Sequence, residues 1–192
     1  MRPVRAAVAA AVTIAVLSGC ARGETANETL PEASPSATET SEALPPLGPP
    51  DLPMPPEARE QSAAGVEAFA RYYIELSNHL LESLESQPLR DLSSQCSTCD
   101  QLADGYDDSQ AQGLTYVGGE IAVVSTGTAM VDTDDAEIPL LLSQSPVRVI
   151  DNQGKDIPER ATDTFQISGG MTLDWDPSRS TWIVTDWTAD RL

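Results

Sequence analysis

The stretch Glu57–Ser86, EAREQSAAGVEAFARYYIELSNHLLESLES, decides the fold of this chain. Its apolar side chains recur at steps of three and four, as on one face of an α-helix; they are Val66, Phe69, Tyr73, Leu76, Leu80 and Leu84. Pro55-Pro56 suits the first helical turn, Glu57 and Glu60 complement the positive end of the helix dipole, and Pro88 ends the pattern. The spacing therefore predicts one long helix whose single apolar face needs a partner surface.

The rest of the chain changes from helical to β periodicity. A shorter helix is expected within Asp100–Gln112, closed by Gly113. Runs rich in β-branched and aromatic residues follow, separated by turn-rich breaks, and predict strands at Leu114–Val117, Ile121–Val124, Thr128–Val131, Ile138–Leu142, Val147–Ile150, Thr164–Trp175 and Thr181–Thr188. Helices followed by sequential strands indicate an α+β domain over residues 57–192, with a long N-terminal helix and a shorter helix packed in a curved antiparallel sheet.

The N-terminal end carries an export signal. Arg2 and Arg5 precede the apolar run Ala6–Leu17, which is too short to span a bilayer of about 30 Å. The run ends in Leu17-Ser18-Gly19-Cys20, which resembles a bacterial lipobox. This predicts a lipoprotein signal peptide at residues 1–19 and acyl chains such as palmitate on Cys20, anchoring the protein on the extracytoplasmic face of the cell membrane. The alternative is an ordinary secretory signal with a chance cysteine.

Residues 20–56 separate this signal from the predicted domain. They contain nine prolines, many Ser, Thr, Glu and Ala residues, and no aromatic residue. Such a composition buries too little apolar surface to offset its ordering entropy, so we predict a disordered tether. A flexible coil of this length reaches about 35 Å.

The charge and the single histidine exclude several classes of function. The net charge of −19 disfavours nucleic-acid binding, because no basic surface exists to displace counterions from phosphates. His79 is the only histidine, which removes most mechanisms that pair a nucleophile with a histidine. It flanks the apolar stripe of the helix, where a solvated position is favoured over a catalytic one.

The two remaining cysteines, Cys96 and Cys99, are expected to form a disulfide, because thiol pairs normally oxidise outside the cytoplasm. A loop of four residues gives about 2 kcal/mol of stabilisation in chain-entropy terms. The pair would join the end of one helix to the start of the next. A redox C-x-x-C motif is the alternative, but no βαβ unit precedes Cys96. A zinc site would need a second Cys or His pair.

An acidic segment resembles a calcium loop only superficially. It contains Asp132, Asp134, Asp135 and Glu137, but an EF-hand needs glycine at position six and glutamate at position twelve. Counted from Asp132, these positions hold Glu137 and Ser143. A solvated acidic turn is expected, and the sequence predicts no metal and no cofactor.

Several motifs together resemble a family of uncharacterised actinobacterial lipoproteins: Met54-Pro55-Pro56, Gly65–Val66, Phe69–Tyr73, Cys96-Ser97-Thr98-Cys99, Gly118-Gly119-Glu120 and Thr181-Trp182-Ile183-Val184. The order of elements is similar to that of the nuclear transport factor 2-like cone fold. That fold hosts isomerases, dehydratases and non-enzymatic binding modules, so the resemblance implies an architecture and not an activity.

The resemblance also implies space at the open end of the cone. Phe69, Tyr73, Trp175 and Trp182 are the aromatic residues able to line it, unless they fill the core instead. We expect a non-catalytic binding or scaffolding domain for an envelope protein or an apolar small molecule. The alternative is a small-molecule enzyme that uses an Asp, Tyr or His acid–base group in the cavity.

Overall fold

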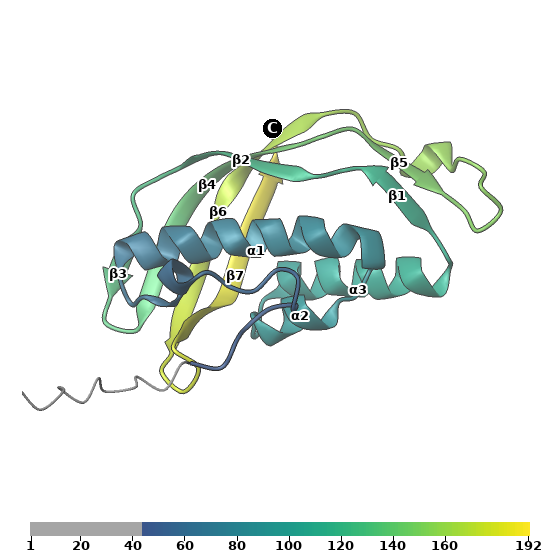
Figure 1. Cartoon of the computed structure of the whole chain (residues 1–192). Helices are drawn as coiled ribbons and strands as arrows, with labels where there is room; N and C mark the ends of the chain where they lie inside the picture. The colour runs from purple at the N-terminus through teal and green to yellow at the C-terminus, as the bar shows by residue number, and fades with distance from the viewer. Residues whose placement is uncertain (1–43) are drawn as a thin grey trace, which may run out of the picture. The chain divides into compact units, whose positions relative to one another are not determined.

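The computed structural model describes residues 44–192. A short 3₁₀-helix η1 (Pro56–Arg59) precedes the helices α1 (Ala63–Ser83), α2 (Gln87–Asp91) and α3 (Ser97–Ala111). The strands follow: β1 (Thr115–Gly118), β2 (Ile121–Thr126), β3 (Met130–Asp132), β4 (Asp135–Gln144), β5 (Val147–Ile150), β6 (Phe165–Asp176) and β7 (Thr181–Arg191). A second 3₁₀-helix, η2 (Pro158–Arg160), lies between β5 and β6. Figure 1 shows the three helices packed together on one side of a curved sheet. The predicted signal peptide, Cys20 and the tether up to residue 43 lie outside the described residues.

The α+β class and the antiparallel pairing are confirmed. The larger sheet has the strand order β2-β4-β6-β7, with β3 also paired to β4. The strands β1 and β5 form a separate two-stranded sheet. The predicted strand at Val147–Ile150 matches β5, and the others agree to within a few residues. The expected single sheet is therefore divided in two.

The division occurs where two neighbouring strands bend at the same level. Ile121 pairs with Gln144 at the end of the larger sheet, and Gly118 pairs with Val147 at the start of the smaller one. Gly118 has φ 77°, and a Cβ on it would collide with the carbonyl oxygen of Pro146. Glycine is thus required at position 118 of β1. On the opposite side, Pro146 between β4 and β5 donates no ladder hydrogen bond.

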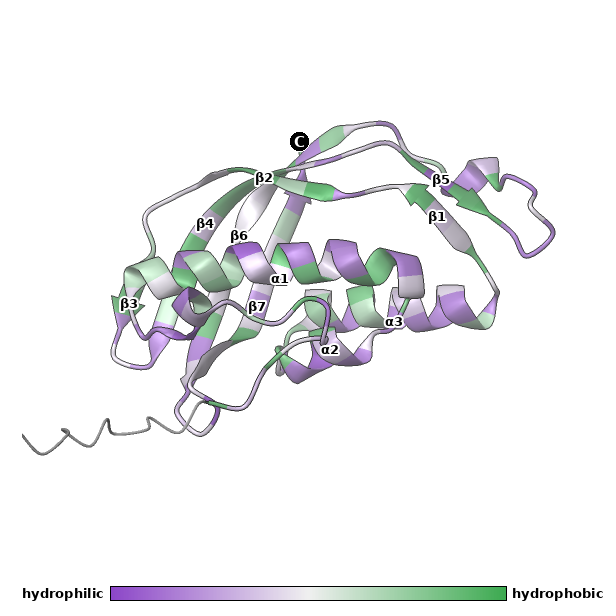
Figure 2. Ribbon diagram, in the orientation of Figure 1, coloured by the Kyte–Doolittle hydropathy of each residue, from purple (hydrophilic) through white to green (hydrophobic). Residues whose placement is uncertain are grey.

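The core lies between α1 and the inner face of the larger sheet. The predicted apolar stripe of α1 is buried, and β4 alternates exposed and buried positions, as expected for a strand with one face on the core. Figure 2 shows apolar positions, in green, along α1 and along the strands. Fully burying each large apolar side chain stabilises the fold by roughly 1.5–3 kcal/mol.

The helix α1 begins later than the predicted start at Glu57. Residues Pro56–Arg59 form the 3₁₀-helix, and α1 starts at Ala63 after Ser62. The Ser62 hydroxyl accepts a hydrogen bond from the backbone N–H of Gly65 at 3.0 Å, which caps the helix. The C-terminal end is closer to expectation, with Leu84 in the left-handed conformation just after Ser83.

Residues 44–56, here called the strap, correct the predicted boundary of the disordered tether. Met54 in the strap is buried, and Leu47 and Leu52 pack against the core. The Tyr72 hydroxyl of α1 donates a hydrogen bond to the Leu52 carbonyl oxygen at 3.0 Å. A composition averaged over residues 20–56 hides these three apolar side chains, and the prolines beside them reduce the entropy lost on ordering.

Polar contacts hold the strap at two points. His79 Nε2 in α1 lies 3.2 Å from Asp51 Oδ2 in the strap. The Arg59 guanidinium donates to the carbonyl oxygen of Pro45 at 2.7 Å and to that of Ser180 at 3.2 Å. The start of the described chain is thereby joined to the turn between β6 and β7. Within residues 44–192, no helix has the length and apolar character to cross a membrane.

Candidate functional site

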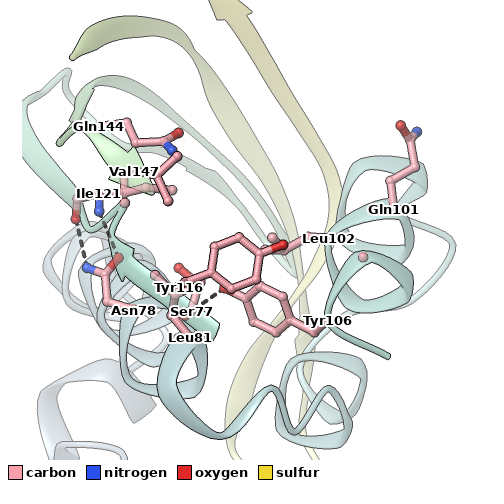
Figure 3. A pocket seen from close by; sticks show the side chains of 12 residues that line it. Ser77, Asn78, Leu81, Gln101, Leu102, Tyr106, Tyr116, Ile121, Gln144 and Val147 are labelled. Atoms are coloured by element: carbon pink, nitrogen blue, oxygen red, sulfur yellow. Dashed lines mark hydrogen bonds between the residues drawn. The ribbon is translucent and has the colours of Figure 1, made fainter. Parts of the chain in front are cut away.

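A cavity of about 230 Å³ lies where the bend in the strands meets α1 and α3. Figure 3 shows its lining side chains. The helices contribute seven residues: Ser77, Asn78 and Leu81 from α1, and Gln101, Leu102, Gly105 and Tyr106 from α3. The strands and the bend contribute Tyr116, Gly119, Ile121, Gln144 and Val147. The division of the sheet therefore forms one wall of the cavity.

Asn78 joins α1 to the start of β2 at the edge of the cavity. Its Nδ2 donates to the Ile121 carbonyl oxygen at 2.8 Å, and its Oδ1 accepts from the Ile121 backbone N–H at 2.8 Å. β2 is an edge strand, and the Asn78 amide makes the two hydrogen bonds with Ile121 that a further strand would make. Both polar atoms of Asn78 are used in this way, so the side chain positions the wall and has little hydrogen-bonding capacity left for a ligand.

Two tyrosines present ring surface to the cavity while their hydroxyl groups bond to the protein. The Tyr106 hydroxyl donates to the Ser77 carbonyl oxygen at 2.8 Å. The Tyr116 hydroxyl lies 2.8 Å from Ser109 Oγ. Burial is the main cause that raises the pKa of Tyr106 above its ordinary value. The rings of both tyrosines supply apolar contact area to the cavity.

Gln144 differs from Asn78 and the two tyrosines of the lining. It is the last residue of β4, at the bend, and Figure 3 shows its carboxamide beside Val147 at the cavity. Among the residues that the structure describes, none forms a hydrogen bond with this carboxamide. One acceptor and two donors are therefore available to a bound molecule.

Gly105 keeps part of the helical wall open. It lies within α3, where glycine costs roughly 0.5–1 kcal/mol relative to alanine. A Cβ built on Gly105 would have no neighbouring atom within 4 Å, so no protein contact requires a glycine. The missing side chain leaves space beside the cavity that a larger residue would occupy.

The lining carries no formal charge. Within the described part of the chain, no Asp, Glu, His, Lys, Arg or Cys lines the cavity, and its titratable groups are the two tyrosines. Residues 44–192 also contain no cluster of His, Cys, Asp or Glu that would bind a metal ion. The arrangement suits reversible binding of an uncharged molecule better than proton transfer near pH 7.

The four aromatic residues proposed for the pocket lie elsewhere. Phe69, Tyr73 and Trp182 are completely buried in the core, and Trp175 is half-buried against Trp182 with ring centroids 5.1 Å apart. Because the inner face of the sheet packs directly on α1, these rings fill the space that the cone analogy left open. The filled-core alternative is the one observed for them.

The predicted disulfide is present, but it joins Cys96, just before α3, to Cys99 in the first turn of the same helix, and does not link two helices. Both cysteines are buried. Cys96 is also the N-cap of α3, and its Sγ accepts from the Cys99 backbone N–H at 3.2 Å. The helix consequently starts at Ser97, earlier than expected. The burial of both cysteines favours the structural assignment over the redox one.

Neither His79 nor the acidic segment contributes to the cavity. His79 contacts the strap, as described above. Asp132 and Asp135 form the last pair of the hairpin between β3 and β4, and both are exposed. The acidic residues therefore form a surface turn.

The sequence matches the family of unknown function DUF6318 over residues 36–188, so the chain belongs to this family. Among curated proteins, none matches the sequence. The expected likeness to a family without known activity is confirmed, while its actinobacterial lipoprotein origin stays a prediction.

Solved structures with a similar fold include NTF2-like proteins. The intermembrane space region of the chloroplast protein ARC6 has a TM-score of 0.50 and 16% identity, covering 68% of this chain and 98% of that one. An NTF2-like superfamily protein from Salmonella enterica has a TM-score of 0.45 and 8% identity, covering 68% and 93%. A putative calcium/calmodulin-dependent protein kinase II association domain from Xanthomonas campestris has a TM-score of 0.39 and 12% identity, covering 68% and 88%. At such identities the likeness concerns the fold alone.

Sequence reasoning missed the residues that line the cavity. Two glycine signals point toward it: Gly105 interrupts a helical segment without a turn nearby, and Gly118-Gly119 marks the bend. Gln144 and Tyr116 carry no such signal, because their position depends on which strands pair.

Proposed function

We propose that this protein is a lipid-anchored envelope protein whose domain is a non-catalytic binding module, with the cavity between α1, α3 and the bend as its binding site. The observation that carries the proposal is the uncharged lining, in which most polar groups already bond to the protein. Such a surface offers shape and apolar contact without a reactive group.

The enzymatic alternative would need an acid–base group that titrates near neutral pH. In the described lining, only Tyr106 and Tyr116 titrate, and the pKa of Tyr106 is raised further from neutrality by burial. An isomerase or dehydratase mechanism therefore has less support here than reversible binding.

The envelope location rests on the sequence. The lipobox-like segment ending at Cys20 supplies the anchor. The disulfide between Cys96 and Cys99 is consistent with an oxidising compartment outside the cytoplasm. The tether would present the domain away from the lipid surface, where it meets apolar small molecules or other envelope proteins.

Native mass spectrometry of the protein released from its own membranes tests the proposal. We expect a non-covalent small-molecule mass on the wild type and its loss in Gly105→Leu, which places a side chain in the cavity. The control is Ala111→Leu, which also introduces a leucine, at an exposed position at the end of the same helix. A ligand retained in Gly105→Leu, or turnover of that ligand by the wild type, contradicts the proposal.

A further inference from the structure

We propose that the cavity takes an uncharged small molecule with one flat apolar ring and one amide-like end, and that this end bonds to the Gln144 carboxamide. The inference rests on the proposed function, because it names the class of ligand for the same site. It follows from the size, surface, charge and unused hydrogen-bonding capacity of the cavity.

The size limits the ligand to about one ring. Cavities that bind drug-sized molecules measure roughly 300–1,000 Å³. The volume here, about 230 Å³, is below that range. A single ring with a short substituent fits, whereas an acyl chain or a sugar polymer would extend far outside.

The lining surface favours a flat apolar body. Leu81, Leu102 and Val147 provide aliphatic contact, and the rings of Tyr106 and Tyr116 provide aromatic contact. Aromatic side chains interact well with another ring in offset or edge-to-face geometry. Gly105 allows the body of the ligand to approach the backbone of α3.

The charge pattern disfavours ions. The described lining provides no counter-ion, so a charged ligand would lose hydration there without gaining a charged partner. The chain as a whole has a net charge of −19, which additionally repels anions. The ligand is therefore neutral at the pH where the protein works.

The polar end is identified by elimination among the lining groups. The Asn78 amide bonds to Ile121, and the two tyrosine hydroxyl groups bond to Ser77 and Ser109. Gln101 of α3 is exposed, and Figure 3 shows its side chain pointing away from the other lining side chains. The Gln144 carboxamide has an acceptor and donors at the same place. A group that offers both a donor and an acceptor, such as a primary amide, lactam or imide edge, satisfies it in a paired geometry.

Three probes of the same shape test the charge: benzamide is neutral, benzoate is an anion and benzamidine is a cation. Binding to the full mature protein is followed by NMR titration, with toluene as the probe that lacks a polar end. We expect benzamide to bind at least tenfold more tightly than benzoate and benzamidine. Equal or tighter binding of either ion overturns the assignment of an uncharged ligand.

Two variants test the residues. Gln144→Met keeps the length of the side chain and removes its hydrogen bonds, so benzamide should weaken about tenfold while toluene is unchanged. The control, Gln166→Met, alters an exposed glutamine of β6 and should have no effect. Gly105→Leu should abolish binding of both probes with an unchanged fold by circular dichroism. Unchanged benzamide affinity in Gln144→Met overturns the role of Gln144.

The two proposals fail separately. If no probe binds but native mass spectrometry finds a charged or much larger ligand that Gly105→Leu removes, the ligand class is wrong and the binding function stands. If no probe binds and no ligand is displaced by Gly105→Leu, both proposals are wrong.

Discussion

The indole Nε1 of Trp182 donates a hydrogen bond to the carbonyl oxygen of Glu60 at 3.0 Å. The contact joins the start of β7 to a residue two positions before the N-cap of α1, although the two residues are 122 positions apart. Trp182 is completely buried, and its neighbour Trp175 packs edge-on against it. The hydrogen bond between Trp182 and Glu60 positions the start of α1 relative to the sheet.

Removal of the Trp182 side chain should destabilise the fold without a specific effect on ligands. Trp182→Ala leaves a large cavity in the core, so the free energy of unfolding should fall by about 3–5 kcal/mol. Urea denaturation measures this loss. A decrease in the free energy of unfolding below about 1 kcal/mol would show that Trp182 is not a core residue. A loss of benzamide affinity beyond what the loss of stability explains would show the same.

Alanine substitution should have opposite effects at two glycines within helices. A Cβ on Gly65 would collide with the Glu60 carbonyl oxygen, so Gly65→Ala should destabilise the protein. A Cβ on Gly105 meets no atom within 4 Å, so Gly105→Ala should stabilise it by roughly 0.5–1 kcal/mol. Thermal unfolding of both variants checks the sign. The same sign at both positions would contradict the description of one of them.

The disulfide should be closed in the exported protein. Intact mass of non-reduced material should lack two hydrogens, and Cys96 and Cys99 should resist alkylation before reduction. Loss of the disulfide in Cys96→Ser/Cys99→Ser should cost about 2 kcal/mol from chain entropy, because only four residues are closed. Two freely alkylated thiols in native protein would instead support a redox role.

Asp176 should contribute stability that depends on pH. Hydrogen bonds from Ser178 and then Arg179 lower the pKa of Asp176 to about 2, from an ordinary value of 3.8. Because the pKa is lower in the folded state, the contribution is fully present above about pH 4 and is lost as the pH falls towards 2. Asp176→Asn should therefore be less stable than the wild type at pH 7, and the difference should shrink between pH 4 and pH 2. A difference that is constant from pH 7 to pH 2 would exclude this contribution.

Cys20 should carry the membrane anchor. Cys20→Ser should abolish lipidation, which metabolic labelling with a palmitate analogue detects, and should leave uncleaved or soluble protein. The cysteine pair at residues 96 and 99 provides an internal control, since its removal should leave labelling unchanged. Normal maturation and membrane fractionation of Cys20→Ser would show that the lipobox interpretation is wrong.

The sequence predicted those parts of the fold that depend on local periodicity. The stripe from Val66 to Leu80 became the buried face of α1, and β5 matched its predicted range. The start of α1 was missed because Glu57 and Glu60 suggested a first turn, whereas the cap is Ser62. A helix boundary that depends on one hydroxyl group is difficult to distinguish from several plausible starts.

The site depended on contacts that no single segment reveals. The close approach of Gly118 to the Pro146 carbonyl oxygen lies at the division of the sheet, and it arises only when β1 pairs with β5. Trp182 was a reasonable pocket candidate by residue type. In the structure its indole bonds to the Glu60 carbonyl oxygen and is completely buried in the core. The strap was missed for the same reason, since Met54 becomes a core residue only when the surface of the domain exists to receive it.

The position of Arg59 determines how mechanical load would enter the domain. Its guanidinium connects Pro45, at the beginning of the described chain, with the turn that contains Ser180. Tension applied from the N-terminal side would therefore act first on this junction and on the β6–β7 hairpin, whose long ladder resists shear. The cavity begins at Ser77, 14 residues and about 21 Å further along α1 than Ala63. Under the proposed anchoring, a pull on the tether would therefore strain this junction before it changed the shape of the cavity.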